Sequence, residues 1–471
     1  MAIFELHQKL IKKEISAVEL VKNYLKKIEE GDKKIHSFLT LTPELALRQA
    51  EEAQEKINRG RKPSLLCGIP CAIKDNISVK DIKCTAGSKI LQDYISPFDA
   101  TVIKKLKKAG AVILGKTNMD EFAMGSSTEN SAFGVTRNPH DLTRVPGGSS
   151  GGSAAAVVSS FCQFALGSDT GSSIRQPASF CGVVGLKPTY SSVSRYGLVA
   201  MASSLDQVGP IANSIEDVKI VFDIIRGKDS LDSTGIESDI RYQIPNVKTL
   251  RIGIPKEYFV EGIEEGVEDK IKSAIEKIRK LGIKIEDISL PHTEYALPTY
   301  SVVMASEASV NLARYDGIRY GLGKSQISNL KPQNLFEFYS RARGKYFGKE
   351  VRRRIILGTF ALSAGYYNEY YLRAQKVRRL IKEDFDKAFL KVDLVLTPTS
   401  PTVAFKIGER TKDPIKMYLA DIFTAGPSLA GLPAISLPCG KVNNLPVGIQ
   451  LIGRPFQEAM ILKAGEVFEK L

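Results

Sequence analysis

Residues 144–177 read RVPGGSSGGSAAAVVSSFCQFALGSDTGSSIRQP and decide the fold more than any other part of the chain. A glycine- and serine-rich loop over residues 146–153 leads directly into the apolar run from Ala154 to Ser160, which predicts a helix. A short strand at residues 164–166 follows, and a second polar loop runs from Gly167 to Ser173. A flexible linker would separate domains, so a loop that enters an apolar helix at once indicates a built site.

Strands and helices alternate along the rest of the chain. Ser16-Ala-Val-Glu19 fits a capping box and Thr42-Pro43 starts a second helix, so the first part of the chain is predicted to be helical. Further strands are predicted near residues 67–74, 111–114, 250–254, 283–290, 394–396 and 434–437, and further helices at residues 99–108, at 264–281 and within 340–390. This alternation predicts the α/β class.

The chain contains no long linker, no internal repeat and no sharp change of composition. We therefore expect one large domain over residues 1–471. Its parts are a helical segment of about residues 1–60, a catalytic core of about 61–210 and a C-terminal part of about 211–471 that carries pocket residues.

Composition excludes several classes of protein. The 471 residues are 43% hydrophobic and 25% charged, as in globular proteins, and no apolar run reaches the roughly 18 residues of a membrane span. The N-terminus lacks the apolar core of a signal peptide, and the six cysteines are sparse, so we expect a cytoplasmic protein with buried, reduced thiols and no membrane contact. The net charge of +14 suits work beside RNA, although lysine-rich proteomes also yield basic proteins without that role.

Two short motifs do not fit the chemistry that they would predict. Gly110 to Thr117 matches a phosphate loop, but its middle residues are Ala, Val, Ile and Leu, which belong in a buried strand. Gly147 to Gly151 matches the nucleophile elbow of Ser-His-Asp hydrolases, but Pro146 disfavours the strand that must precede it. His292 is the one histidine that follows, and no histidine has metal-ligand spacing with a cysteine, so no metal is expected.

A lysine and two serines form a third candidate site. Lys74 ends a predicted strand, Ser149 lies in the first serine loop, and Ser173 ends the second. A serine nucleophile needs a base, and a lysine that burial keeps neutral can serve, with a second serine passing the proton.

These residues resemble the amidase signature family. The resemblance rests on Gly68-Ile-Pro-Cys-Ala-Ile-Lys74 and on the two serine loops, which occur in the family's order, and it covers essentially the whole chain. It implies a single α/β domain in which helices cover both faces of a central mixed β-sheet. It also implies that Lys74 is the base, Ser149 the relay serine after a cis peptide bond, and Ser173 the acylated nucleophile. The oxyanion hole would be made by the backbone N–H groups of Thr170, Gly171, Ser172 and Ser173.

Ser172 departs from the family pattern, in which two glycines usually precede the nucleophile. If this position requires a positive φ, a serine is strained there and the geometry of the oxyanion hole changes.

Within the family, the chain is most similar to the glutaminase components of tRNA-dependent amidotransferases. The stretches Met119-Asp-Glu-Phe-Ala-Met-Gly125 and Met417-Tyr-Leu-Ala-Asp421 carry part of this similarity. It implies that Arg354 and Asp421 hold the α-carboxylate and α-amino groups of glutamine, and that Tyr300 and Gly125 line the same pocket. The chemistry agrees, because a zwitterion needs one cation and one anion, whereas a lipid amide needs neither.

The resemblance implies a glutaminase that supplies ammonia to a partner. Ser173 would attack the side-chain amide of glutamine, and a B subunit would use the ammonia to convert Glu-tRNA(Gln) to Gln-tRNA(Gln). A small C subunit would complete the heterotrimer, and mischarged tRNA would be met through the complex. No cofactor is expected on this chain, whereas ATP and Mg are expected on the partner.

The sequence leaves some alternatives open. Asp-tRNA(Asn) is a second candidate substrate beside Glu-tRNA(Gln). A free-standing amidase would hydrolyse small carboxamides without partners, and a noncatalytic RNA-binding or scaffold protein would keep only the fold.

Overall fold

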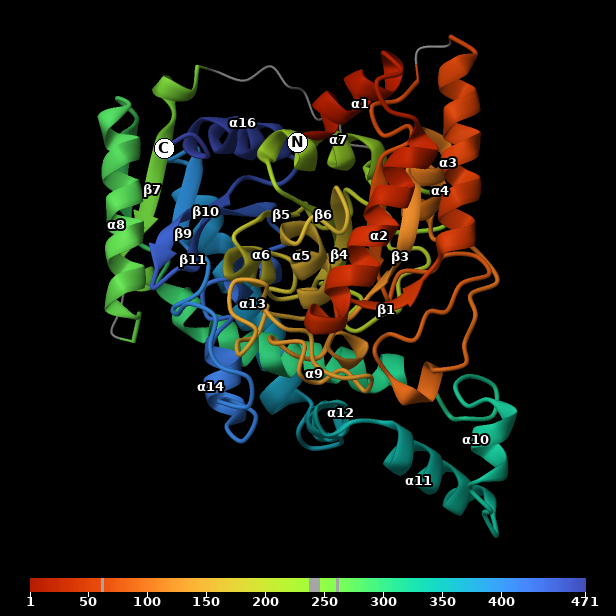
Figure 1. The fold of residues 1–471 in the computed structure, drawn as a ribbon. Coiled ribbons are helices and arrows are strands. Elements are labelled where there is room, and N and C mark those ends of the chain that lie inside the picture. The colour runs from red at the N-terminus through yellow and green to blue at the C-terminus, as the bar shows by residue number, and fades with distance from the viewer. Residues whose placement is uncertain (61–62, 237–245, 260–261) are drawn as a thin grey trace.

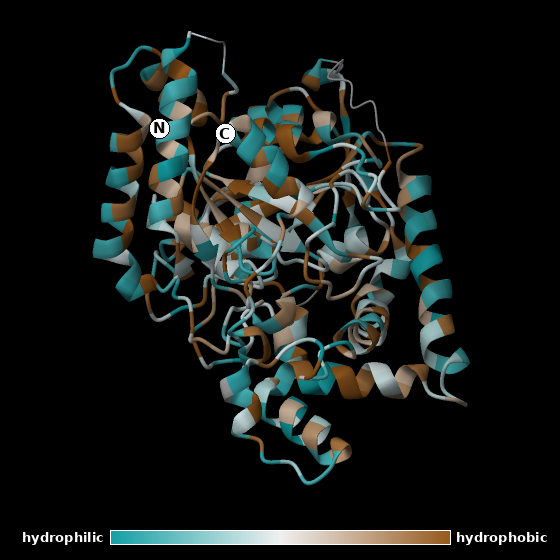
Figure 2. Ribbon diagram, turned by 90° about the vertical axis from the view of Figure 1, so that its right-hand side faces the viewer, coloured by the Kyte–Doolittle hydropathy of each residue, from teal (hydrophilic) through white to brown (hydrophobic). Residues whose placement is uncertain are grey.

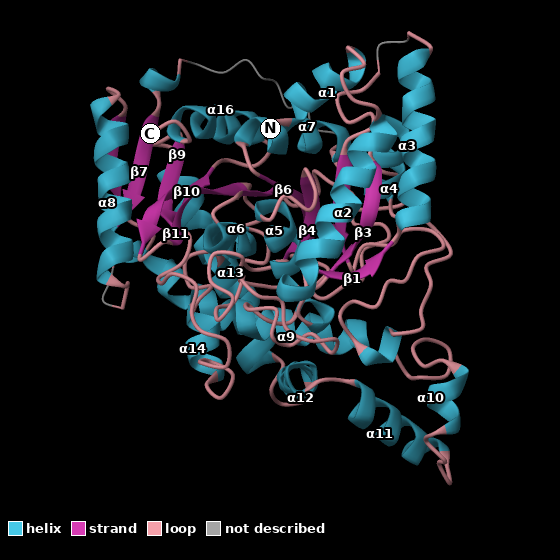
Figure 3. Cartoon of the chain, in the orientation of Figure 1, coloured by secondary structure: helices cyan, strands magenta, loops and turns pink. Residues whose placement is uncertain are grey.

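The computed structural model describes residues 1–60, 63–236, 246–259 and 262–471. Within these residues, eleven strands form one sheet in the order β1-β3-β2-β4-β6-β5-β10-β11-β9-β7-β8 (Figures 1 and 3). The strands are β1 (Phe38–Leu41), β2 (Pro70–Lys74), β3 (Val112–Thr117), β4 (Phe164–Asp169), β5 (Val184–Lys187), β6 (Gln207–Ala212), β7 (Arg251–Pro255), β8 (Lys284–Ile288), β9 (Leu394–Pro398), β10 (Ala434–Val442) and β11 (Leu445–Ile452). β2 runs parallel to β3 and β4, and β7 runs parallel to β8 and β9, whereas the other pairs are antiparallel. The predicted α/β class and the mixed sheet are confirmed.

The α-helices mostly pack around this sheet, whereas those over residues 324–362 extend away from it (Figure 1). They are α1 (Ile3–Ile11), α2 (Ala17–Ile35), α3 (Pro43–Asn58), α4 (Thr101–Ala109), α5 (Gly151–Val158), α6 (Arg175–Cys181), α7 (Ile215–Ile225), α8 (Glu265–Lys280), α9 (Ala296–Leu312), α10 (Lys324–Ser328), α11 (Leu335–Tyr346), α12 (Lys349–Leu362), α13 (Arg373–Ala388), α14 (Pro414–Leu419), α15 (Ala425–Leu429) and α16 (Glu458–Phe468). No helix in the described residues is long and apolar enough to cross a membrane.

Alternate residues of β11 meet helices on opposite faces of the sheet, as the pleat requires. Gln450 accepts a hydrogen bond from Arg175 at the start of α6. Leu451, the next residue, belongs to the same hydrophobic cluster as Ile461 of α16. A second hydrophobic cluster joins α9, α12 and α13, and the pocket described below lies beside it. Figure 2 shows hydrophobic residues concentrated in the interior elements.

The sequence predictions hold for most elements. Ser16 caps α2 by accepting from the backbone N–H of Glu19, and Pro43 opens α3. The phosphate-loop match lies in the buried strand β3, so its N–H groups serve the sheet. Five of the cysteines are buried and Cys439 is half-buried, and all six are free thiols.

Three predictions about elements are wrong in detail. The N-terminal segment is not only helical, because Phe38–Leu41 forms β1 at the edge of the sheet. The first serine loop is shorter than predicted, because α5 begins at Gly151 and not at Ala154. The second loop is also shorter, because β4 continues through Asp169 and pairs with β6 along its whole length.

Candidate active site

The candidate site lies where the parallel strands β2 and β4 end. Lys74 is the last residue of β2, and Ser168 and Asp169 are the last residues of β4. The carboxyl ends of neighbouring parallel strands meet at one edge of a sheet, and ligands commonly bind there in α/β proteins. The loop that carries Ser149 and the turn that carries Ser173 both reach this edge, because each precedes a helix packed on the sheet.

Lys74 is fully buried and held by three contacts. Its Nζ donates to Ser149 Oγ at 2.7 Å, to Ser168 Oγ at 2.9 Å and to the Ser168 carbonyl at 3.1 Å. Burial lowers the pKa of Lys74 to about 7, although three carboxylates, from Asp120, Asp169 and Asp206, act in the opposite direction. A large fraction of Lys74 is therefore neutral near pH 7 and can accept a proton. Ser168 was not predicted from the sequence, because its role arises from the pairing of β4 with β2.

The glycines around Ser149 are required by close packing and do not make a flexible linker. The Gly148–Ser149 peptide bond is cis, as the family resemblance implies. A Cβ at Gly148 would overlap the Asp120 carboxylate, and one at Gly152 would overlap the backbone of Asn118. Asp120 in turn accepts from the backbone N–H of Thr128 at 2.8 Å. The whole loop is thus buried and fixed.

Ser173 follows the β4 strand end, and its side chain lines a pocket. It is 4% exposed, and its carbonyl accepts from the backbone N–H of Ser150 at 3.1 Å, which places the two serine loops side by side. Within the described residues, no hydrogen bond joins the hydroxyls of Ser149 and Ser173. Catalytic hydrogen bonds commonly tighten only when the substrate is bound.

The turn before Ser173 has the form of an oxyanion hole. In the part of the chain that the structure describes, the backbone N–H groups of residues 170–173 donate to no other protein group. Ser172 does not have a positive φ, so the condition under which a serine would be strained at this position is not met. Gly171 is required for another reason, because a Cβ there would lie 2.6 Å from Cζ of Tyr300.

A buried ion pair fixes this turn from behind. Arg175 Nη2 lies 3.0 Å from Asp169 Oδ1, and both side chains are fully buried. The same guanidinium donates to the Gly171 carbonyl at 2.7 Å and to Ser428 Oγ at 2.7 Å. Although burial favours the neutral acid, Arg175 holds the pKa of Asp169 below its usual value. Both residues lie within the motif at residues 144–177, but the sequence alone predicted no role for either.

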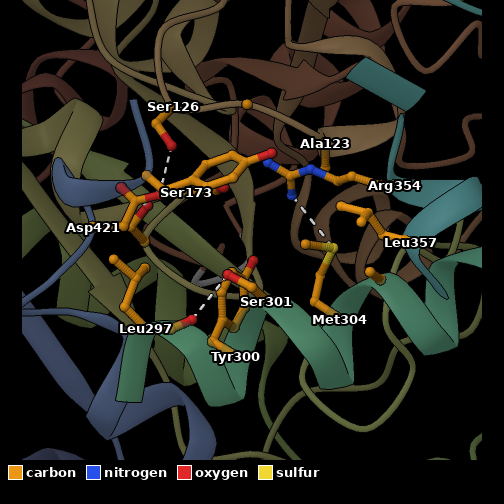
Figure 4. A pocket seen from close by; sticks show the side chains of 14 residues that line it. Ala123, Ser126, Ser173, Leu297, Tyr300, Ser301, Met304, Arg354, Leu357 and Asp421 are labelled. Carbon is orange, nitrogen blue, oxygen red and sulfur yellow. Dashed lines mark hydrogen bonds between the residues drawn. The ribbon is translucent and has the colours of Figure 1, made fainter. Parts of the chain in front are cut away.

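The pocket brings Ser173 together with one cation and one anion. Figure 4 shows Ser173, Arg354 and Asp421 directed into it from three segments of the chain. Its lining includes all four residues that the resemblance assigned to the glutamine pocket, namely Gly125, Tyr300, Arg354 and Asp421.

Arg354 on α12 is 5% exposed, so it is no solvated surface charge. Its Nε donates to Glu350 Oε1 at 2.7 Å, and its guanidinium lies 5.2 Å from the ring of Tyr418. Nη1 contacts the sulfur of Met304 at 3.3 Å, a weak acceptor. The guanidinium is therefore anchored through Nε, and its terminal nitrogens are suited to bind a carboxylate in two places.

Asp421 is the anion of the pocket. Its Oδ2 accepts from Ser126 Oγ at 2.5 Å, and its Oδ1 accepts from Ser172 Oγ at 2.6 Å. Burial raises the pKa of Asp421 to about 6, although both hydroxyls and Arg354 favour the charged form. Asp421 is therefore mostly ionised at neutral pH and can bind a cation.

Two neighbours shape this pocket without carrying charge. Tyr300 packs against Gly171, and burial raises the pKa of its phenol, so it stays protonated. A Cβ at Gly125 would overlap the side chains of Asp120 and Asn130, so only glycine fits there.

In the described ranges, no three His, Cys, Asp or Glu side chains gather as metal ligands.

The sequence is similar to those of known proteins over nearly its whole length. The sequence model of the Amidase family matches residues 19–462. The A subunit of glutamyl-tRNA(Gln) amidotransferase from Carboxydothermus hydrogenoformans is 57% identical over 470 residues, which is 99% of this chain and 96% of that protein.

Solved structures share the fold. The crystal structure of the A subunit of glutamyl-tRNA(Gln) amidotransferase from Thermotoga maritima aligns with a TM-score of 0.79 and 44% identity, over 100% of this chain and 93% of that chain. Peptide amidase from Stenotrophomonas maltophilia aligns with a TM-score of 0.80 and 27% identity, over 100% of this chain and 96% of that one.

Proposed function

Because the chain belongs to the amidase family, we propose that it is the glutamine-hydrolysing component of a tRNA-dependent amidotransferase. The observation that carries this proposal is the pocket in which Arg354 and Asp421 face the same space as Ser173. Arg354 can bind the carboxylate and Asp421 the ammonium group of a free amino acid. The side-chain amide of glutamine can then extend to Ser173. The 57% identity to the Carboxydothermus hydrogenoformans protein, the A subunit of a glutamyl-tRNA(Gln) amidotransferase, supports the assignment to this kind of enzyme.

We propose the following reaction. Neutral Lys74 takes the proton of Ser149, which takes the proton of Ser173 as its Oγ bonds to the amide carbon of glutamine. The N–H groups of residues 170–173 stabilise the oxyanion, a contribution that is typically about 3–4 kcal/mol for a single donor. Lys74 returns its proton through Ser149 to the amide nitrogen as the C–N bond breaks, so ammonia leaves, a glutamyl ester remains on Ser173 and Lys74 is neutral again. Water then attacks the ester, with Lys74 as base, and the products are glutamate and free enzyme.

We propose that the ammonia is used by a partner. The names of the relatives assign them to a glutamyl-tRNA(Gln) amidotransferase, and a lettered component implies that the enzyme has others. For this chain we infer a B subunit that binds Glu-tRNA(Gln), ATP and Mg, and a small C subunit. Asp-tRNA(Asn) is a second candidate for the complex. Work on charged tRNA would place the chain in the cytoplasm.

Glutamate release tests the proposal. The purified chain is assayed with glutamine, alone and with its B and C subunits, beside Ser173→Ala as the matched control. We expect serine-dependent release with a clear preference for glutamine over butyramide, which has the amide but neither charge. Turnover of butyramide in preference to glutamine would support the free-standing amidase, and no turnover in the assembled complex would support the noncatalytic scaffold.

A further inference from the structure

Ser172 makes a contact that a glycine could not make. The residue lies between Gly171 and the nucleophile Ser173, is 2% exposed and lines the pocket. Its Oγ donates to Asp421 Oδ1 at 2.6 Å, across 249 residues of sequence. The hydroxyl therefore links the oxyanion turn directly to the anion of the pocket.

The backbone does not explain why a serine stands here. The φ of Ser172 is not positive, and its carbonyl accepts from the backbone N–H of Gln176 at 2.9 Å, a bond that any residue could make. The feature that depends on the side chain is the hydrogen bond to Asp421. Ser126 Oγ donates to the other oxygen of this carboxylate, so each carboxylate oxygen accepts a hydrogen bond from one serine.

We propose that Ser172 is a positioning residue that fixes the Asp421 carboxylate for the α-ammonium group of glutamine. This inference rests on the proposed function and deepens it. An ionised carboxylate has about four acceptor positions, so two remain for the ammonium when each oxygen accepts one serine hydroxyl. A carboxylate held at both oxygens cannot rotate away, and the ammonium meets it at a fixed angle.

The charge state of Asp421 also depends on this hydroxyl. Charged and titratable groups near Asp421 include Arg354 on α12, Asp169 at the end of β4, Tyr300 on α9 and Tyr418 on α14. Burial raises the pKa of Asp421, and the Ser172 hydroxyl acts against burial by stabilising the ionised form. Loss of the hydroxyl should therefore raise this pKa further, and the affinity for an ammonium ligand should fall at a higher pH.

Binding on an inactive background tests this inference. The full chain carrying Ser173→Ala is titrated by calorimetry with L-glutamine between pH 5 and pH 8. The same titrations are made with 4-carbamoylbutanoate, which is glutamine without its α-amino group. Ser172→Ala and Ser172→Gly are each added to this background. Ser309→Ala is the matched control, because the Ser309 hydroxyl is buried on α9 and donates only to the Ser306 carbonyl of the same helix.

We expect the pH midpoint of glutamine binding to rise by about one unit in both Ser172 variants, the scale of one hydrogen bond to a charged group. A rise from about 6 to about 7 weakens binding about fivefold at pH 6 and hardly at all at pH 8. Binding of 4-carbamoylbutanoate should stay the same, since Lys74 and the pocket walls are common to both ligands.

The outcomes separate this inference from the proposed function. An unchanged midpoint, or an equal effect on both ligands, would overturn the role of Ser172 while leaving glutamine as the substrate. If Ser173→Ala binds glutamine no better than 4-carbamoylbutanoate at pH 8, the ammonium site itself is wrong, and both proposals fall.

Discussion

Lys74 should set the acid limit of glutamine hydrolysis. A lysine with the ordinary pKa of 10.5 is neutral in about one molecule in a thousand at pH 7.5. Burial lowers the pKa of Lys74 to about 7, so about three quarters of the molecules are neutral at the same pH. The fold thus increases the amount of competent base about 750-fold.

The pH dependence follows from two groups. As pH falls through 7, protonation of Lys74 should lower kcat/KM about tenfold for each pH unit. Below about pH 6, Asp421 also becomes protonated and stops binding the ammonium group, so the fall for glutamine should steepen to about a hundredfold for each unit. Butyramide has no ammonium group, and its profile should keep the tenfold slope.

The assay is glutamate release between pH 5.5 and pH 8.5, with ammonia release for butyramide and circular dichroism to confirm folding at each pH. Lys74→Arg supplies the matched control, because a guanidinium keeps its charge throughout this range and cannot act as base. A flat kcat/KM for glutamine from pH 8 to pH 6, or substantial activity of Lys74→Arg, would refute the role of neutral Lys74.

Three substitutions test other parts of the site. Ser173→Ala should lower the rate of glutamine hydrolysis by at least about 10⁴-fold while the circular dichroism spectrum stays unchanged. Arg354→Lys should raise the KM for glutamine about 10–100-fold and leave the KM for butyramide unchanged, because an ammonium cannot hold a carboxylate in two places; an equal rise for both substrates would contradict the proposed carboxylate contact. Arg175→Met should lower the free energy of unfolding by about 3–5 kcal/mol in urea titrations, because it leaves Asp169 buried without its partner; a loss below about 1 kcal/mol would show that Asp169 is compensated elsewhere.

Local patterns were enough to predict the α/β class, the strand end and the two serine loops of the site, whereas Arg354 and Asp421 were assigned only through the family resemblance. Lys74, Ser149 and Ser173 could be singled out because each stands at the end of a strand or within a loop of unusual composition. The roles of Ser168 and Arg175 could not, because they depend on which strands are neighbours and on contacts with distant segments.

The start of α5 was also predicted wrongly because it depends on contacts with distant segments. Glycine disfavours a helix, so the start of α5 was predicted to follow Gly151 and Gly152. In the structure these glycines form its first turn, because side chains there would overlap Thr128 and Asn118. At these two positions, the close packing against Thr128 and Asn118 requires glycine, although glycine has a low helix propensity.

Burial shifts the pKa values of Lys74 and Asp421 in opposite directions, and these shifts determine which of the two groups is protonated first as the pH falls. It disfavours the charged form of each, and therefore lowers the pKa of Lys74 and raises that of Asp421. The two values, about 7 and about 6, leave Asp421 ionised wherever Lys74 is neutral. On acidification, we expect the neutral base to be lost before the ammonium contact, so that bound glutamine is no longer hydrolysed. Ser172 widens this interval, since its hydroxyl favours the ionised form of Asp421. A glycine in its place would bring the two titrations together, and substrate binding and proton transfer would then be lost at the same pH.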